Sequence, residues 1–460
     1  MPARTPKRKG LLALALILAP TAGVPQAPAD AVRLTVDEAQ MMAVQALHQK
    51  RPKLAYQLSE GVLKANPRDG RAHYTQALAF AQVEAYGFSR KSARRAYYTA
   101  NSPIQKYDAA QLASVMAYKD ERLTLSQLWL RRAAHHAPDE GERAETIRAF
   151  QTVRARNPLN FNLKFSVSPS DNVNNGANSP YNIIDGSPLV GQLSASAQAI
   201  AGTVATTDLQ LSYRIAETEN SMTRLTGRAY TRQVRFNNAV AGLSSRDLSS
   251  ARIEAGISHT FSGGRRDGAW QVDATGGRVW YGTDPLYDYA RIGLKRHQKL
   301  TETLRLSFGG GIERQQDETF PKNDATLYDA FAQLSYTLGS GGQLGAYINM
   351  REVDSNGINS SSVQWTGIVS YTMGREIGPA RLSLSVGQSV VDYDRYSVVF
   401  PVPGGRVDDS IFGGVTATFS DWSYLGFVPT LSVRAEKSRS NISRFDVDES
   451  SISLGIRSEF

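Results

Sequence analysis

The sequence has 460 residues, with 52 Lys and Arg against 43 Asp and Glu, a formal charge of +9, and it is rich in Gly (38), Tyr (20) and Phe (16). That length is enough for two or three domains. Cys is absent, which excludes a disulfide framework, a thiol nucleophile and every metal site built on Cys.

The first 31 residues have the three parts of a secretory signal peptide. Residues 4–9 carry four basic side chains, residues 11–19 are apolar, and residues 29–31 (Ala-Asp-Ala) offer small side chains at the spacing of a signal-peptidase site. The apolar stretch is far shorter than the ~20 residues of a membrane-spanning helix. Because no Cys follows it, lipidation as a lipoprotein is excluded. We therefore expect residues 1–31 to direct export and to be removed.

The positive charge is concentrated in one part of the chain. Residues 32–157 hold 20 basic and 12 acidic residues, whereas residues 158–460 hold 28 basic and 30 acidic residues. In an exported protein, nucleic acid is an improbable partner for this charge. An acidic protein or lipid headgroups are the better candidates.

Residues 32–157 have the composition and spacing of a helical repeat. Pro67, Pro103 and Pro138 lie 36 and 35 residues apart, close to the ~34-residue period of tetratricopeptide repeats, which end each helix pair with a Pro. We expect two to three degenerate repeats, with the repeat positions occupied by Ala43, Ala55, Val62, Ala79 and Ala133. Such repeats stack helix pairs, because one pair cannot bury its apolar face alone.

Two groups of polar residues in this segment invite a functional interpretation. Arg90, Lys91, Arg94 and Arg95 place four charges in one stretch, which is either a partner-docking patch or a solvated helix face. His135 and His136 are adjacent, so they point in different directions on a helix and do not form the i, i+4 pair that a metal requires.

From residue 158 onward the hydrophobic period changes to two. Leu304, Leu306, Phe308 and Ile312 share one parity, and the same pattern recurs up to the end of the chain, where Ile452, Leu454, Ile456 and Phe460 alternate with polar residues. One face of each strand is therefore apolar and the other polar. A soluble sandwich would bury the apolar face, whereas a transmembrane barrel turns it toward lipid around a polar lumen.

The lengths of the connections favour the barrel. Long and short connections alternate, with one exception at 283–287, as in bacterial outer-membrane barrels, which also have even strand numbers. An even number places both ends of the barrel, and with them the helical repeat, in the periplasm. We predict fourteen strands, at 160–169, 193–216, 221–236, 247–261, 269–282, 288–298, 302–314, 327–338, 343–354, 362–373, 380–395, 410–420, 426–438 and 449–460.

An Asn- and Gly-rich run follows the first predicted strand. It fits a loop outside the hydrocarbon layer, in which every backbone group must be paired. Counted from Asp171 it fails the pattern of a calcium loop, because the third position is Val173 and the twelfth is Asn182. We therefore expect no metal here, and no cofactor elsewhere in the chain.

These features together resemble the surface lipoprotein assembly modifier family of Gram-negative bacteria. The resemblance covers the signal peptide, a short tetratricopeptide-type domain, a motif after the first strand with Pro169, Asp171, Asn172 and Asn174, and a fourteen-stranded barrel ending on Phe460. It implies transport of lipoproteins or related secreted carrier proteins across the outer membrane. The helical domain would receive cargo or a chaperone, and the barrel-assembly machinery would read Ile456 and Phe460 at the C-terminus.

Other functions remain open at this stage. Exporters of exopolysaccharide also join tetratricopeptide repeats to a barrel, although with longer arrays, and a channel or porin is a further alternative. An enzyme is not expected, because no G-x-S-x-G motif is present and His259 lies on an apolar stripe with Ile253 and Ile257, which suits an interfacial side chain. We expect a monomeric barrel in outer-membrane lipid.

Overall fold

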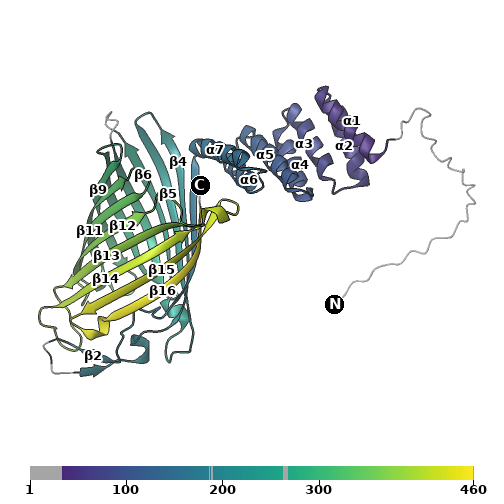
Figure 1. Cartoon of the computed structure of the whole chain (residues 1–460). Coiled ribbons are helices and arrows are strands. Elements are labelled where there is room, and N and C mark those ends of the chain that lie inside the picture. The colour runs from purple at the N-terminus through teal and green to yellow at the C-terminus, as the bar shows by residue number, and fades with distance from the viewer. Residues whose placement is uncertain (1–33, 186, 188–189, 263–267, 459–460) are drawn as a thin grey trace, which may run out of the picture.

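The computed structural model describes residues 34–185, 187, 190–262 and 268–458. The expected signal peptide and the terminal Phe460 lie outside these residues. Figure 1 shows a row of helices that leads away from one end of a barrel. We call that end of the barrel the helical end and the opposite one the loop end. No helix in the described part of the chain is long and apolar enough to cross a membrane.

The first part of the described chain forms seven helices. Three helix pairs are followed by a single helix, and each pair turns at a residue with positive φ, namely Lys50 (56°), Glu84 (56°) or Glu121 (55°). This repeated turn confirms three repeats. The helices are α1 (Val36–His48), α2 (Pro52–Ala65), α3 (Gly70–Gln82), α4 (Tyr86–Thr99), α5 (Pro103–Lys119), α6 (Leu123–His135) and α7 (Glu140–Arg156).

Local sequence explains where the helices begin. Thr35 and Glu38 form a capping box at α1, and the side chains of Asp69, Ser102 and Asp139 accept hydrogen bonds from the first turns of α3, α5 and α7. These caps satisfy backbone N–H groups that have no partner within the helix.

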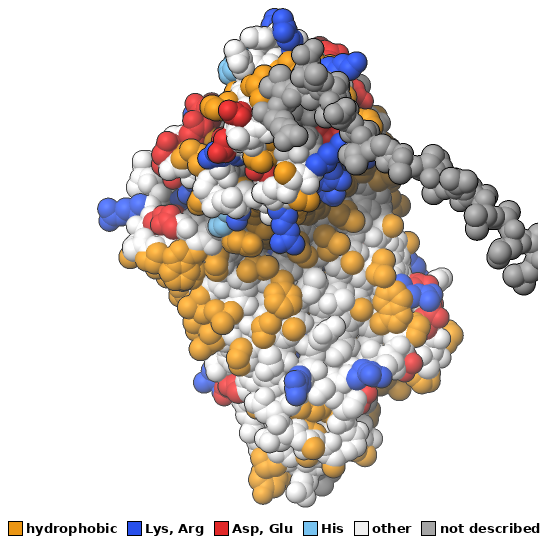
Figure 2. Space-filling view, turned by 90° about the vertical axis from the view of Figure 1, so that its right-hand side faces the viewer, with side chains coloured by type: hydrophobic (Ala, Val, Ile, Leu, Met, Phe, Trp, Pro, Cys, Tyr) orange, Lys and Arg blue, Asp and Glu red, His pale blue; other side chains and the backbone are white. Residues whose placement is uncertain are grey.

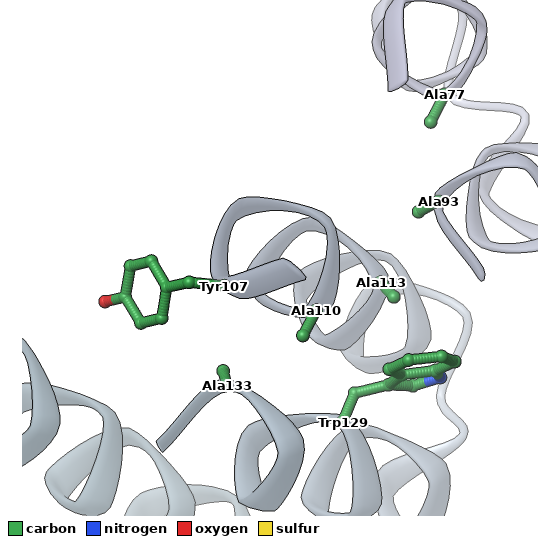
Figure 3. Close-up of a cluster of buried hydrophobic side chains, with 7 residues drawn as sticks. All are labelled: Ala77, Ala93, Tyr107, Ala110, Ala113, Trp129 and Ala133. Carbon is green, nitrogen blue, oxygen red and sulfur yellow. The ribbon is translucent and has the colours of Figure 1, made fainter. Parts of the chain in front are cut away.

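The helical core is built from alanines around the rings of Tyr107 and Trp129. Trp129 is only 2% exposed and packs between α5 and α6, where the side chains of Ala110, Ala113 and Ala133 leave room for it (Figure 3). Small side chains let helices approach closely at the usual separations of packed helices. The five expected repeat positions are all buried: Ala43, Ala55, Val62, Ala79 and Ala133.

The rest of the chain forms a closed antiparallel barrel of fourteen strands, as predicted, with β1 paired to both β16 and β4. A short hairpin, β2 and β3, lies in the first loop. The elements are β1 (Leu159–Ser170), β2 (Tyr181–Ile183), β3 (Val190–Gln192), β4 (Gly202–Glu217), β5 (Ser221–Phe236), β6 (Ser250–Phe261), β7 (Gly268–Tyr281), β8 (Asp284–Lys299), β9 (Leu304–Asp317), β10 (Ala325–Thr337), β11 (Gln343–Ser355), β12 (Ser362–Thr372), β13 (Arg381–Tyr393), β14 (Arg406–Thr418), β15 (Phe427–Ser440) and β16 (Val447–Ser458).

The apolar side chains of the strands face outward. Ile292, Val369 and Leu454 are 66%, 55% and 65% exposed, although they are among the most hydrophobic side chains in the chain. In Figure 2 hydrophobic side chains gather on the barrel wall, whereas many charged side chains gather on the helical domain above it. A soluble sandwich would have buried these side chains. The outer face is therefore the lipid-facing surface of a transmembrane barrel.

The expected difference in length between the connections of the two ends holds only in part, because 373–380 and 419–426 at the helical end are longer than 318–324, 356–361 and 441–446 at the loop end. Those at the helical end are 218–220, 262–267, 300–303, 338–342, 373–380 and 419–426, and those at the loop end are 171–201, 237–249, 282–283, 318–324, 356–361, 394–405 and 441–446. The shortest connection of the loop end is the tight turn 282–283, where Gly282 takes a φ of +67°. It replaces the predicted connection 283–287, because β8 already begins at Asp284. One prediction is wrong: residues 193–201 belong to the first loop rather than to a strand, for a reason given below.

Candidate functional site: the barrel lumen and its two ends

One side of the lumen is lined by paired charges. We call this inner face of β4–β10 the charge-paired wall. Arg228 donates to both carboxylate oxygens of Asp208 at 2.8 and 3.1 Å. Further pairs are Arg252 with Glu254, Lys295 with Asp273, and Arg291 with Asp329. Because each of these carboxylates has a cationic partner, the wall is polar without carrying a large field of one sign.

The opposite side, the inner face of β12–β15, is lined mainly by hydroxyl groups, and we call it the hydroxyl wall. Hydroxyls of neighbouring strands bond to each other at 2.9–3.0 Å in four pairs: Thr366 with Ser389, Thr372 with Ser383, Ser410 with Ser438, and Thr416 with Ser432. Arg434 and Glu436 add an ion pair at 2.9 Å. Hydroxyls both donate and accept, so this wall suits an uncharged polar chain as well as water.

The motif residue Asn172 shapes the first loop, residues 171–201. It is 1% exposed, its Oδ1 accepts a hydrogen bond from the Gly176 N–H at 2.8 Å, and its Nδ2 donates to the Gly176 carbonyl at 2.9 Å. A Cβ at Gly176 would lie 2.2 Å from the Gln198 carbonyl oxygen, so only Gly fits there. The asparagine therefore acts as a substitute for backbone pairing within the loop.

The motif residue Asn174 explains why no strand begins at residue 193. Its Nδ2 donates to the carbonyls of Ser196 and Gln198, and its Oδ1 accepts from the Ile200 N–H at 2.9 Å. These backbone groups are thereby engaged by a side chain rather than by a neighbouring strand. Sequence alternation alone did not reveal that competition.

The first loop folds against the inner wall of the barrel. Val173 and Ile200 pack on Val234 and Leu248, and Val234 lies on β5 with the same inward parity as Arg228. Arg232, also inward, donates to the Val173 carbonyl at 2.7 Å. The loop therefore narrows the opening of the lumen at the loop end.

The same loop reaches the other side of the opening. Ile184 packs on Val402 and Ile442, which belong to the two loops on either side of β14 and β15. Ile442 is fully buried there. The first loop thus contacts both the β5–β6 side and the β14–β15 side of the barrel.

The remaining motif residues lie at the closure of the barrel. Asp171 accepts hydrogen bonds from the N–H and hydroxyl of Ser450 on β16, at 3.1 and 3.0 Å. Pro169, near the end of β1, pairs in register with Thr203. The carboxylate of Asp171 is therefore used in holding the loop to β16, and among the described residues no group of His, Asp and Glu has the geometry of a metal site.

At the helical end, Arg131 of α6 joins the two parts of the molecule. It is 5% exposed, its Nη2 donates to the Ser458 hydroxyl at 2.9 Å, and its guanidinium lies 5.3–5.7 Å from the ring centres of Phe150, Phe161 and Phe427. These partners come from α7, β1, β15 and β16. Burial, with Arg154 nearby, lowers the pKa of Arg131 to about 10, so the cation persists at neutral pH.

The connection 419–426 at the helical end completes this contact. The ring of Tyr424 lies 4.8 Å from that of His135 on α6. Gly426 takes a φ of +76°, and a Cβ there would come within 2.9 Å of the Arg131 side chain. The close approach of Arg131 therefore depends on Gly426.

The helical domain also reaches the lumen. A cavity of about 380 Å³ at the helical end of the barrel is lined by inward residues such as Asn162 and Gln210, and by Arg154 of α7. Arg154 thus places a cation of α7 next to the lumen at this end.

The four residues of the expected docking patch have different surroundings in the structure. Arg90 forms an ion pair with Asp120 at 3.4 Å and is 18% exposed, and Lys91 lies over the Phe88 ring. Arg94 and Arg95 are exposed and line a cleft between α2 and α4. The sequence alone could not sort these four cations, because their partners lie on other helices.

The positions of the other sequence candidates are as follows. Ile456 faces outward on β16, 41% exposed, while Phe460 lies outside the described residues. His259 also faces outward, bonded to Thr223 at 2.9 Å and stacked on Phe261. The side chains of His135 and His136 were expected to point in different directions, but they lie together. His136 is the C-cap of α6, and the two rings lie 4.8 Å apart.

Comparison with known proteins gives distant structural likenesses only. No family model matches the sequence, and no curated protein matches it. The helical part is similar to the type III secretion translocator chaperone SycD of Yersinia enterocolitica, at 10% identity over 26% of this chain and 84% of that one, with a TM-score of 0.24. The barrel is similar to the outer-membrane channel DcaP of Acinetobacter baumannii (10% identity, 66% and 97% coverage, TM-score 0.39) and to a loop-deleted OmpT of Vibrio cholerae (12%, 65% and 98%, 0.31).

These likenesses are too distant to carry a function. The class follows from the closed fourteen-stranded topology, the outward apolar face and the polar lumen. The chain is an outer-membrane type β-barrel with a helical repeat domain docked on one end.

Proposed function

We propose that this protein is a non-enzymatic translocon of the outer membrane of a Gram-negative bacterium. The barrel provides a route for exported lipoproteins or related secreted carrier proteins, and the helical domain receives them in the periplasm. The resemblance to the surface lipoprotein assembly modifier family motivates this cargo. A monomeric barrel, insertion by the barrel-assembly machinery through Ile456 and Phe460, and the absence of nucleic-acid partners and cofactors belong to the same proposal.

The observation that carries the proposal is the docking of the helical domain beside the lumen. Arg131 fixes α6 to the ends of β1, β15 and β16, and Arg154 of α7 lines the lumen itself. A simple diffusion channel gains nothing from a basic domain held at this position. A receptor for a charged partner gains a fixed route along the helices to the pore.

A deletion strain tests the proposal. We expect candidate lipoproteins to disappear from the cell surface, measured as loss of cleavage by an external protease, and to return when the full chain is supplied from a plasmid. Total lipoprotein in whole-cell lysates serves as the control for expression. Unchanged surface cleavage in the deletion strain would show that the chain does not export these proteins.

A second candidate is export of an uncharged polysaccharide, which the hydroxyl wall favours. In that case the deletion strain would lose extracellular polymer while the surface proteins remain cleavable. The same strain therefore separates the two functions.

A further inference from the structure

The cleft between α2 and α4 has the properties of a ligand site. Its volume is about 810 Å³, and its floor is formed by α3. That volume is within the range of ~300–1,000 Å³ that is usual for ligand pockets. We call this space the α2–α4 cleft.

One part of the cleft is basic. Arg94 and Arg95 are exposed at its edge, and in the part of the chain that the structure describes neither forms an ion pair or a side-chain hydrogen bond. Glu60 is the single acidic residue among those that line the cleft. Two cations without partners against one acid make the space favourable for an anionic group.

A buried histidine supplies an independent indication. His73 lines the cleft and is only 7% exposed, its Nε2 lies 3.0 Å from the Pro67 carbonyl oxygen, and its Nδ1 has no hydrogen-bond partner among the described residues. In the tautomer with Nε2–H donating to Pro67, Nδ1 is a free acceptor. Buried polar atoms are rarely left without a partner. This one lies beside the cleft but is itself covered, so a ligand reaches it only after a small shift of the ring.

Aromatic rings extend the cleft in the other direction. Tyr56, which lines it, lies 5.3 Å from Phe80, and Phe80 lies 5.5 Å from Phe88 between ring centres. Phe88 is 62% exposed. The surface from Arg95 to Phe88 thus joins a basic part to an apolar one, and this combination is more typical of a peptide site than of a site for a lone phosphate.

We propose that the α2–α4 cleft binds an acidic peptide segment that also carries aromatic or aliphatic side chains. The carboxylates lie against Arg94 and Arg95, and the apolar side chains cover Phe80 and Phe88. The segment belongs to the partner that the helical domain receives, so this inference rests on the proposed function. Residues 32–157 hold 20 basic against 12 acidic residues, which also favours an acidic partner.

The first experiment uses the full chain in detergent and a short fluorescent peptide that alternates Glu with Phe and Leu. We expect saturable binding, and no binding of the same peptide with Lys in place of Glu. The variant R94E/R95E should weaken binding by at least about tenfold, since two attractions become repulsions. R94Q/R95Q should weaken it less, and circular dichroism checks that both variants fold.

A matched control keeps the charge change but moves it out of the cleft. Lys53 and Lys64 are exposed on α2 and do not line the cleft, so K53E/K64E should leave the affinity within about twofold, as expected for screened charges. Equal losses of affinity in R94E/R95E and K53E/K64E would show that the effect comes from the net charge of the domain, and would overturn the site. Binding only to vesicles that contain phosphatidylglycerol, with no peptide binding, would also overturn it.

A second experiment separates this inference from the proposed function. In the deletion strain, a plasmid copy carrying R94E/R95E should fail to restore surface cleavage of the cargo, while K53E/K64E restores it. If the deletion abolishes surface display but R94E/R95E restores it, the export function stands and the cleft is not the docking site. If the deletion changes nothing, the function itself fails, whatever the peptide does.

Discussion

The helical domain and the barrel use apolar side chains in opposite ways. In the helical domain Trp129 and the alanines around it are buried, with Ala77, Ala93, Ala110 and Ala133 fully enclosed. In the barrel, large aliphatic side chains such as Ile292 and Leu454 are more than half exposed, and the inner face carries ion pairs and hydroxyls. One chain therefore folds for two solvents, water around the helices and hydrocarbon around the strands.

The largest expected effect is in the helical core. Trp129→Ala removes a ring that is 2% exposed and leaves a cavity among alanines that are too small to fill it. Changes of this kind cost about 3–5 kcal/mol, so the helical domain should unfold at a lower denaturant concentration. Circular dichroism at the helix band measures this unfolding. Leu128→Ala, next in sequence but 38% exposed, is the control and should change little.

A charge on the outer face should be the next largest effect. Val369 faces outward and its neighbour Ser370 faces inward on β12. Val369→Lys should cost up to about 2–4 kcal/mol in a bilayer, because the ammonium would face hydrocarbon. Ser370→Lys should be nearly neutral. Reversible unfolding of the two variants in lipid vesicles measures the difference, and equal costs would contradict the assigned facing of the strand.

The docking of the two regions should depend on the cation of Arg131. Arg131→Met keeps much of the side-chain volume but loses the attraction to three rings and the bond to Ser458. Each buried cation–π contact is worth about 1–2 kcal/mol, so we expect faster hydrogen exchange in α6 and α7 while the barrel stays closed. Arg148→Met, on the exposed side of α7, should leave exchange unchanged.

A smaller and more local effect is expected in the first loop. Asn172→Ala leaves the N–H and the carbonyl of Gly176 without their partner in a buried place, which costs about 1–3 kcal/mol. The loop should then become sensitive to added protease in detergent, with cleavage between residues 171 and 201 and an intact barrel. Asp185→Ala is the control, because Asp185 lies in the same loop and is exposed, whereas Asn175 has a φ of +50° that alanine tolerates poorly.

The comparison of the two regions also explains what the sequence could predict. Period-two alternation and the spacing of prolines depend on neighbours along the chain, so fourteen strands and two to three repeats were predicted from them. Long-range partners left no such trace. Nothing in the sequence around Asn174 indicates that its side chain takes the backbone of residues 196–200, or that Arg90 has Asp120 as a partner while Arg94 and Arg95 do not.

The smallest expected effect is a pH dependence confined to the helical domain. Burial lowers the pKa of His73 and of His136 below the ordinary value of 6.5. Between the lowered pKa and 6.5 the unfolded chain binds more protons than the folded one, so stability is complete above pH 6.5 and falls as the pH drops below it. The helix signal should therefore melt earlier at pH 5 than at pH 7.5. The variant H73Q/H136Q should reduce that difference, whereas H48Q, at an exposed histidine of α1, should not. A shift of equal size in the melting of the barrel would contradict the assignment of the pH dependence to His73 and His136, because both lie in the helical domain.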